Sequence, residues 1–190
     1  MICSTWSLAR LITHLLSPAG VAAAVFTGIP LLTGEGTRAG VIAFAIYVAL
    51  PVALIAWLKA AWALEDVYDP ETPIRNRILM LGNIVYLIGF VTLMTIDATP
   101  LVLWGAASFL AGGVMVGLIS RFWKISIHAV GVGGGMIILL VAGGPGLWPV
   151  VFAPLLVSWA RLRLGAHTIG QLVAGTALGA GLSRALLPLF

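Results

Sequence analysis

Most of the side chains with functional chemistry in this chain lie in three short segments, which cover residues 65–77, 120–128 and 160–171. The third segment has the most specific spacing. Arg161 lies six residues before His167, and Gln171 lies four residues after it. Because residues four apart are neighbours on a helix, a helix that begins near Thr168 would bring His167 and Gln171 together. The segment predicts a histidine held by a polar partner, with an arginine nearby in the chain.

The second segment supplies another histidine. Ser126 and His128 lie two residues apart where an apolar run begins, and Lys124 precedes them. Arg75 and Arg77 end the first segment. Arginine has a planar fork that makes charge-assisted, bidentate hydrogen bonds to phosphate. Two histidines, a serine and several basic residues at one membrane depth are therefore typical of a site for an anion such as a phosphate.

Acidic residues dominate the start of the first segment. Asp66 and Asp69, together with Glu65, could bind Mg²⁺, which takes oxygen ligands and often bridges to substrate phosphates. Such a site would suit an enzyme that acts on a prenyl diphosphate. The motif is short and common, so we favour no metal ligand and keep Asp66 and Asp69 as an alternative.

The composition is that of a membrane protein. Of the 190 residues, 61% are hydrophobic and 8% are charged, whereas a soluble domain is about 45–50% apolar and about 25% charged. Four runs contain no Asp, Glu, Lys or Arg: residues 78–96, 98–120, 125–160 and 164–183. About 20 apolar residues cross a bilayer as a helix, and long unbroken runs argue against barrel strands. We therefore expect one all-α domain, residues 1–190, built as a polytopic transmembrane helical bundle.

The apolar runs predict seven spans, at about residues 11–34, 39–64, 78–96, 99–119, 129–143, 146–160 and 169–188. The fifth and sixth are short, and the breaker cluster Gly143–Gly146 between them favours a tight hairpin. Removal of the first span as a signal peptide would leave six. Since that run reaches Leu32 without a clear cleavage boundary, we expect it to stay. Glycines recur in the later spans and predict close helix packing.

The distribution of charge predicts orientation. Seven crossings place the N-terminus and all three polar segments on one face, together with eight of the ten Lys and Arg residues. Only Arg38 and Arg184 lie opposite, and the positive-inside rule makes the basic face cytoplasmic, in an inner or plasma membrane.

Because the basic residues lie in short loops, we predict no nucleic-acid partner. We interpret His14 as structural, and Cys3, the only cysteine, allows no intrachain disulfide.

Two of the polar patterns resemble motifs of the type 2 phosphatidic acid phosphatase superfamily. Ser126-Ile127-His128 resembles the second motif of that family, P-S-G-H. Ala160-Arg161 with His167 resembles the third, S-R-x5-H-x3-D. The resemblance covers roughly the chain from Arg75 to the end, and the motifs stand in the family's order.

The chain departs from the family pattern at several positions. Gln171 stands where the third motif has aspartate, and Ala160 stands where it has serine. Ile125 stands where the second motif has proline, and Ile127 stands where it has glycine. Of the first motif, K-x6-R-P, only Arg75 and Arg77 are candidate remnants.

The resemblance implies a membrane enzyme that hydrolyses or transfers a phosphoryl group of a lipid phosphate or polyprenyl (di)phosphate. In this family one histidine forms a phosphohistidine and the other protonates the leaving alcohol, which makes His167 the nucleophile and His128 the acid. Arg161, with Arg75 and the other basic residues, would hold the phosphoryl oxygens, and no metal or other cofactor is required. Gln171 can orient His167 but carries no charge, so we expect slow, altered or absent turnover.

Two other functions stay open on the sequence. One is a magnesium-dependent prenyl-diphosphate enzyme that uses the acidic residues 65–71. The other is a non-catalytic lipid-phosphate binder or transporter that keeps the arginines without the full mechanism. For Ser126 and Gln171, the sequence supports a role in helix packing about as well as a role in the site. The sequence names neither the lipid nor the oligomeric state.

Overall fold

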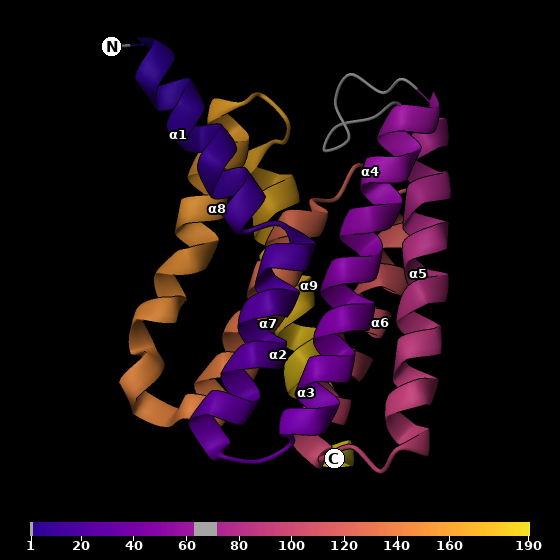
Figure 1. Ribbon diagram of the computed structural model, residues 1–190. Coiled ribbons are helices and arrows are strands. Elements are labelled where there is room, and N and C mark those ends of the chain that lie inside the picture. Colours follow the sequence, from indigo (N-terminus) through magenta and orange to yellow (C-terminus); the bar gives the residue numbers. More distant parts are fainter. Residues whose placement is uncertain (1, 63–71) are drawn as a thin grey trace.

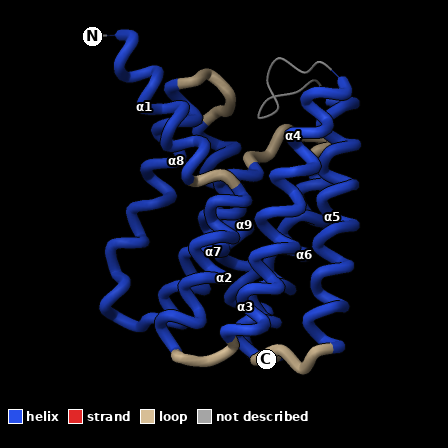
Figure 2. The backbone as a smooth tube through the Cα atoms, viewed as in Figure 1, coloured by secondary structure: helices blue, strands red, loops and turns tan. Residues whose placement is uncertain are grey.

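The computed structural model describes residues 2–62 and 72–190, and every regular element in these residues is helical (Figure 1, Figure 2). In chain order the elements are α1 (Ile2–Leu15), α2 (Pro18–Thr33), α3 (Thr37–Phe44), the π-helix η1 (Ala45–Ala49), α4 (Leu50–Trp62), α5 (Thr72–Thr95), α6 (Pro100–Ile119), α7 (Ile127–Gly143), the 3-10 helix η2 (Gly144–Phe152), α8 (Ala153–Arg163), α9 (Ile169–Leu186) and the 3-10 helix η3 (Leu187–Leu189). The predicted all-α class is confirmed.

Several helical stretches are long and apolar enough to cross a membrane. Among the described residues there are five: Thr37–Ala61, Ile74–Thr95, Pro100–Ile119, Ile127–Arg163 and Ile169–Leu189. The bent pair Thr5–Leu15 and Pro18–Thr33, whose axes differ by 51°, makes a sixth if it forms one span. The prediction of a membrane-embedded helical bundle is confirmed at this level.

The first predicted span is broken. The sequence predicted one run from residue 11, but α1 ends at Leu15 and α2 begins at Pro18. Ser17 caps the new helix, since its Oγ accepts a hydrogen bond from Gly20 N at 3.2 Å. Proline is favoured at the first helical position because its missing N–H would have no helical partner there. The cap and the proline start a second helix in a new direction.

The chain turns back after α7 and returns through η2 to α8, which lies beside α1 (Figure 1). α7 ends at Gly143, within the predicted breaker cluster, and Gly144 has a φ of 62°, which favours glycine. The turn at residues 120–126 and the turn at residues 164–168 therefore lie at the same end of the bundle. The C-terminus lies at the opposite end (Figure 1).

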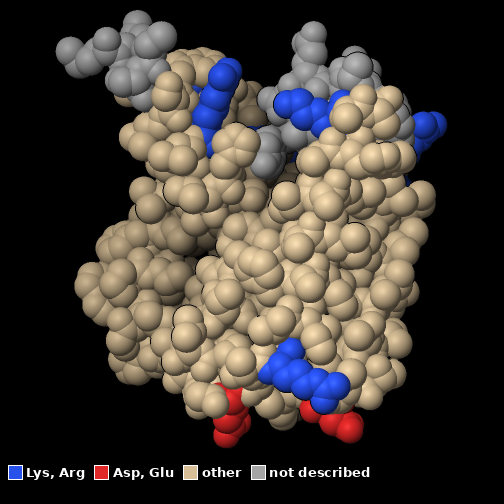
Figure 3. Space-filling model, viewed as in Figure 1, with Lys and Arg blue, Asp and Glu red and all other residues tan. Residues whose placement is uncertain are grey.

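The two ends of the bundle differ in charge (Figure 3). Eight of the ten Lys and Arg residues belong to α1, the end of α4, the start of α5, the α6–α7 turn and the end of α8. The other two, Arg38 and Arg184, lie at the opposite end with Glu35 and Asp97. One end is thus strongly basic in the described residues, while the other is balanced.

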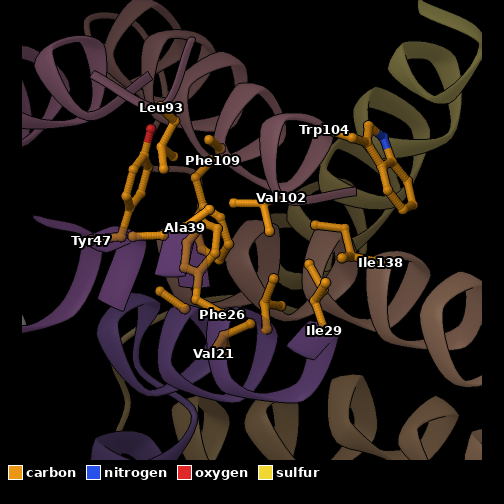
Figure 4. Packing of buried hydrophobic residues seen from close by; sticks show 14 of the residues in the cluster. Val21, Phe26, Ile29, Ala39, Tyr47, Leu93, Val102, Trp104, Phe109 and Ile138 are labelled. Atoms are coloured by element: carbon orange, nitrogen blue, oxygen red, sulfur yellow. The ribbon is translucent and has the colours of Figure 1, made fainter. Parts of the chain in front are cut away.

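Aromatic packing fixes α2, η1, α5 and α6 to one another (Figure 4). The ring centroid of Phe26 lies 4.9 Å from that of Tyr47 and 5.7 Å from that of Phe109. Tyr47 stacks on Tyr86 at 5.0 Å, and its hydroxyl donates to the Tyr86 carbonyl at 2.8 Å. Such offset ring pairs stabilise a core, and the buried hydroxyl keeps a hydrogen bond. By contrast α4, which follows η1 in the chain, makes few contacts with α5.

Glycines bring α7 and α9 into the closest helix pairing of the bundle. A Cβ at Gly179 would overlap the carbonyl of Val130, and one at Gly133 would overlap the carbonyl of Thr176. A Cβ at Gly175 would lie 2.9 Å from the Ser126 carbonyl oxygen, beside the start of α7. Small residues are what close backbone approach in lipid requires. The pairing therefore sets the N-terminus of α7 against that of α9, where the two candidate histidines lie.

We expect Gly179→Ala to destabilise the protein by about 1–3 kcal/mol, because the added methyl meets backbone atoms of α7 that cannot move aside. Thermal unfolding in one detergent measures the loss as a lower Tm. Gly181→Ala is the matched control, since it lies on the same helix with open space around its Cα. Equal Tm values for the two variants would contradict the packing described.

Candidate functional site

A helix-ending turn joins Arg161 to His167. α8 ends in a Schellman motif, in which Ala166 N donates to the Arg161 carbonyl and Gly165 N donates to the Leu162 carbonyl, both at 3.0 Å. Gly165 adopts a φ of 67°, where a side chain would be strained. This turn explains the spacing of the third motif, because it places Arg161 in the last helical turn and His167 just beyond the reversal.

A capping box begins α9 and holds His167. Thr168 Oγ1 accepts from Gln171 N at 3.4 Å, and Gln171 Oε1 accepts from Thr168 N at 3.0 Å. The same Oε1 lies 3.2 Å from His167 Nδ1. An amide oxygen only accepts hydrogen bonds, so Nδ1 carries the proton and Nε2 keeps its lone pair. The predicted pairing of His167 with Gln171 is confirmed.

The second motif forms the N-terminus of α7. Ser126 is the N-cap, and its Oγ accepts from Ala129 N at 3.4 Å. His128 lies in the first turn and is 2% exposed, whereas Ser126 is fully buried. The Ser126 hydroxyl thus positions the helix that carries His128, and the residue does not line the pocket around that histidine.

The two candidate arginines of α5 differ in position. Arg75 is half-buried, and its Nη2 donates to the Ile125 carbonyl at 2.6 Å, which ties the start of α5 to the loop before α7. Arg77 is exposed. Residues two apart on a helix point about 200° apart, so the two side chains lie on opposite faces. The structure brings Arg75 to the site and leaves Arg77 outside it.

One pocket joins four of the predicted site residues. His128, His167, Arg75 and Lys124 line a pocket with a volume of about 200 Å³, and the rest of its wall is mainly apolar. Arg161, only 2% exposed, does not line this pocket but interacts electrostatically with both histidines. The two motifs and the start of α5 therefore converge, as a shared anion site requires.

The pKa of His167 is lowered to about 4 from its usual 6.5. Burial is the main cause and the positive charge of Arg161 the next, while the hydrogen bond to Gln171 acts in the opposite direction. Lys124 and Arg75 lower the pKa further. At pH 7 the ring is therefore neutral, and the lone pair of Nε2 can attack a phosphorus atom as a nucleophile.

The structure adds residues that the sequence analysis did not place at the site. His14, interpreted above as structural, interacts electrostatically with His128. Asn83 and Tyr86, from the middle of α5, line the far part of the pocket. The only signal for the α5 residues is their position eight and eleven residues after Arg75, about two and three helical turns further along the same helix. No sequence pattern predicts that α1 lies near α7.

Asp66 and Asp69, the alternative ligands for Mg²⁺, lie outside the described residues. In the part of the chain that the structure describes, no group of three or more His, Cys, Asp or Glu is placed to hold a metal ion. The magnesium site stays a prediction of the sequence.

Comparison with known proteins adds no information about the site. No family model, curated protein or solved structure matches this chain. The resemblance to the phosphatase superfamily is therefore carried by the residues of the second and third motifs. Four features bear on it: the shared pocket of His128 and His167, the burial of Arg161, the tautomer of His167 and the position of Arg75.

Gln171→Glu is expected to raise the pKa of His167 by about one to two pH units, because a carboxylate stabilises the protonated ring. Glutamate suits this position of a capping box as well as glutamine does, so the start of α9 should be kept. NMR titration of the imidazole measures the change. Gly170→Glu adds the same charge one residue earlier in open space and should leave the pKa of His167 nearly unchanged. An equal rise in both variants would contradict a direct contact.

Proposed function

We propose that this chain is a membrane-embedded enzyme that hydrolyses or transfers the phosphoryl group of a lipid phosphate or polyprenyl (di)phosphate through a phosphohistidine. The observation that carries the proposal is the pocket that His128 and His167 share. Its polar end holds Arg75 and Lys124, and its remaining wall is mainly apolar. An amphiphile with a phosphate head matches both parts.

The basic residues provide the binding energy for the phosphate. Arg75 and Lys124 line the pocket, and Arg161 is buried and interacts electrostatically with both histidines. In a site of low dielectric, fixed positive charges stabilise the charge on the phosphoryl oxygens more strongly than water does. Because their own positions are held by helix ends and turns, little reorganisation is needed when the substrate arrives.

The reaction has two displacements. In the first, the Nε2 lone pair of His167 attacks phosphorus, the bond from phosphorus to the lipid oxygen breaks, and His128 donates a proton to that oxygen. In the second, water attacks the phosphohistidine, His128 takes a proton from the water, and phosphate leaves with His167 restored. An alcohol in place of water would give transfer instead of hydrolysis. Covalent catalysis of this kind divides one difficult displacement into two.

Gln171 limits the rate of the first displacement. It orients the ring through the 3.2 Å contact with Nδ1, but it brings no negative charge to stabilise the cationic phosphohistidine. Turnover is therefore slower than with a carboxylate at this position. The same feature would suit a lipid-phosphate binder that does not turn over, and the experiment below separates the two.

Orientation and span number form part of the proposal. Seven crossings, with α1 and α2 as one broken span and η2 with α8 as another, agree with the chain reversal after α7 and with opposite ends for the two termini. The strongly basic end then faces the cytoplasm by the positive-inside rule, in an inner or plasma membrane. The site opens at that end.

A panel of lipid phosphates tests the function. Purified protein in lipid nanodiscs should release inorganic phosphate from at least one lipid monophosphate or polyprenyl diphosphate, and EDTA should not change the rate because the two displacements use no metal. Release that requires added Mg²⁺ and is lost in Asp66→Asn or Asp69→Asn would support the prenyl-diphosphate alternative instead. Saturable binding without release under any ion condition would support the non-catalytic alternative.

A further inference from the structure

The pocket around the histidines continues along α5 into the apolar part of the bundle. On this helix its wall extends from Arg75 to Tyr86, and the eleven residue-to-residue steps between them correspond to about 16 Å of helix. Half of the hydrocarbon core of a bilayer is about 15 Å thick. The pocket therefore reaches from the polar end of the bundle to about the depth of the bilayer centre.

The pocket is narrow and has an apolar wall. Between its two ends it is lined by side chains of α4 and α5 that include Val52, Leu54, Ile55, Ile78 and Leu79. Its volume is about 200 Å³, and a cavity of about 150 Å³ holds a single benzene ring. A pocket of this volume spread over this length has room for one hydrocarbon chain and not for two side by side.

The side and the far end of the pocket have different properties. Val52, in the α4 wall of the pocket, is 51% exposed, and α4 makes few contacts with α5. A chain can therefore enter from the bilayer between these helices. Near the far end, Asn83 donates its amide hydrogen to the Gly113 carbonyl at 3.1 Å, which joins α5 to α6 in the pocket wall.

Gly82 lies in this wall between Leu79 and Asn83. A Cβ added at Gly82 would have no atom within 4 Å, so a side chain added at this position would begin in open space at the pocket wall. We propose that the substrate is a phosphate ester with a single hydrocarbon chain, and that Gly82 keeps open the path of that chain. The inference rests on the proposed function, because it assumes that the phosphate head binds between the two histidines.

The experiment compares Gly82→Leu with Gly181→Leu, another helical glycine with open space around it but outside the pocket. Butyl phosphate, hexadecyl phosphate and a diacyl phosphatidate are offered to each protein in nanodiscs. The unmodified chain should prefer hexadecyl phosphate over the other two. Gly82→Leu should lower kcat/KM for hexadecyl phosphate roughly tenfold, the factor expected when two methylenes are no longer buried. Gly181→Leu should leave the rates with both alkyl phosphates unchanged.

Binding separates this inference from the proposed function. Hexadecylphosphonate has a carbon–phosphorus bond that hydrolysis cannot cleave, and its Kd should rise roughly tenfold in Gly82→Leu and stay unchanged in Gly181→Leu. That result without any phosphate release would overturn the proposed function and support the chain pocket. Hydrolysis that is equally fast with one or two chains, and equally fast in both variants, would overturn the chain pocket and leave the function intact.

Discussion

His167→Asn is expected to reduce lipid-phosphate hydrolysis by at least about 10⁴-fold, because loss of a covalent nucleophile removes the whole reaction path and not one contact. Stability should change little. The capping box between Thr168 and Gln171 does not use the imidazole, so the start of α9 is retained. The measurement is single-turnover phosphate release beside thermal unfolding.

Arg77→Gln is the control for that variant, since Arg77 is exposed and does not line the pocket. It should keep nearly full activity. If His167→Asn released phosphate as fast as the unmodified chain, the phosphohistidine would be excluded and any activity would need another nucleophile.

His128→Asn is expected to slow hydrolysis of an alkyl phosphate by about 10²–10⁴-fold, the usual contribution of a general acid. The loss should be much smaller with nitrophenyl phosphate, because its leaving phenolate needs no proton. Stopped-flow release of nitrophenol should then show a burst followed by a slow phase, since attack of water on the phosphohistidine also uses His128.

A uniform loss with both leaving groups would assign His128 to phosphate binding or to packing instead of proton transfer. Its position makes this distinction necessary, because a residue that is 2% exposed in the first turn of α7 could also matter for stability. Thermal unfolding of the His128→Asn protein accompanies the kinetics for that reason.

The part of the site that is local in sequence was predictable. The contact between His167 and Gln171 depends only on a helix that begins at Thr168, and Thr168 is a favoured N-cap residue. The turn between Arg161 and His167 similarly follows from a helix end with glycine after it. Such features need no knowledge of the rest of the fold.

The parts that depend on packing were not predictable. Arg75 and Arg77 have the same chemistry, and only the rotation of α5 in the bundle decides which one lines the pocket. The interaction between His14 and His128 depends on the bend between α1 and α2 and on the packing of α1 against α8. The apolar pocket itself is lined by residues of α2, α4, α5 and α7, and no single segment encodes that.

The glycines illustrate both situations. Their abundance predicted close helix packing, but not which helices would meet. Gly175 and Gly179 contact α7 so closely that a methyl group cannot be added, while Gly181 on the same helix has open space around it. Helix rotation again decides the difference.

Rapid-quench labelling of the unmodified chain with a lipid phosphate that carries radioactive phosphorus tests the central claim most directly. The account predicts a protein-bound phosphate that survives alkali, is lost in mild acid and maps to His167. It also predicts that this adduct accumulates in His128→Asn when labelled nitrophenyl phosphate, whose leaving group needs no proton, replaces the lipid. Steady phosphate release with no protein-bound label in either protein, or label on a residue other than His167, would contradict it.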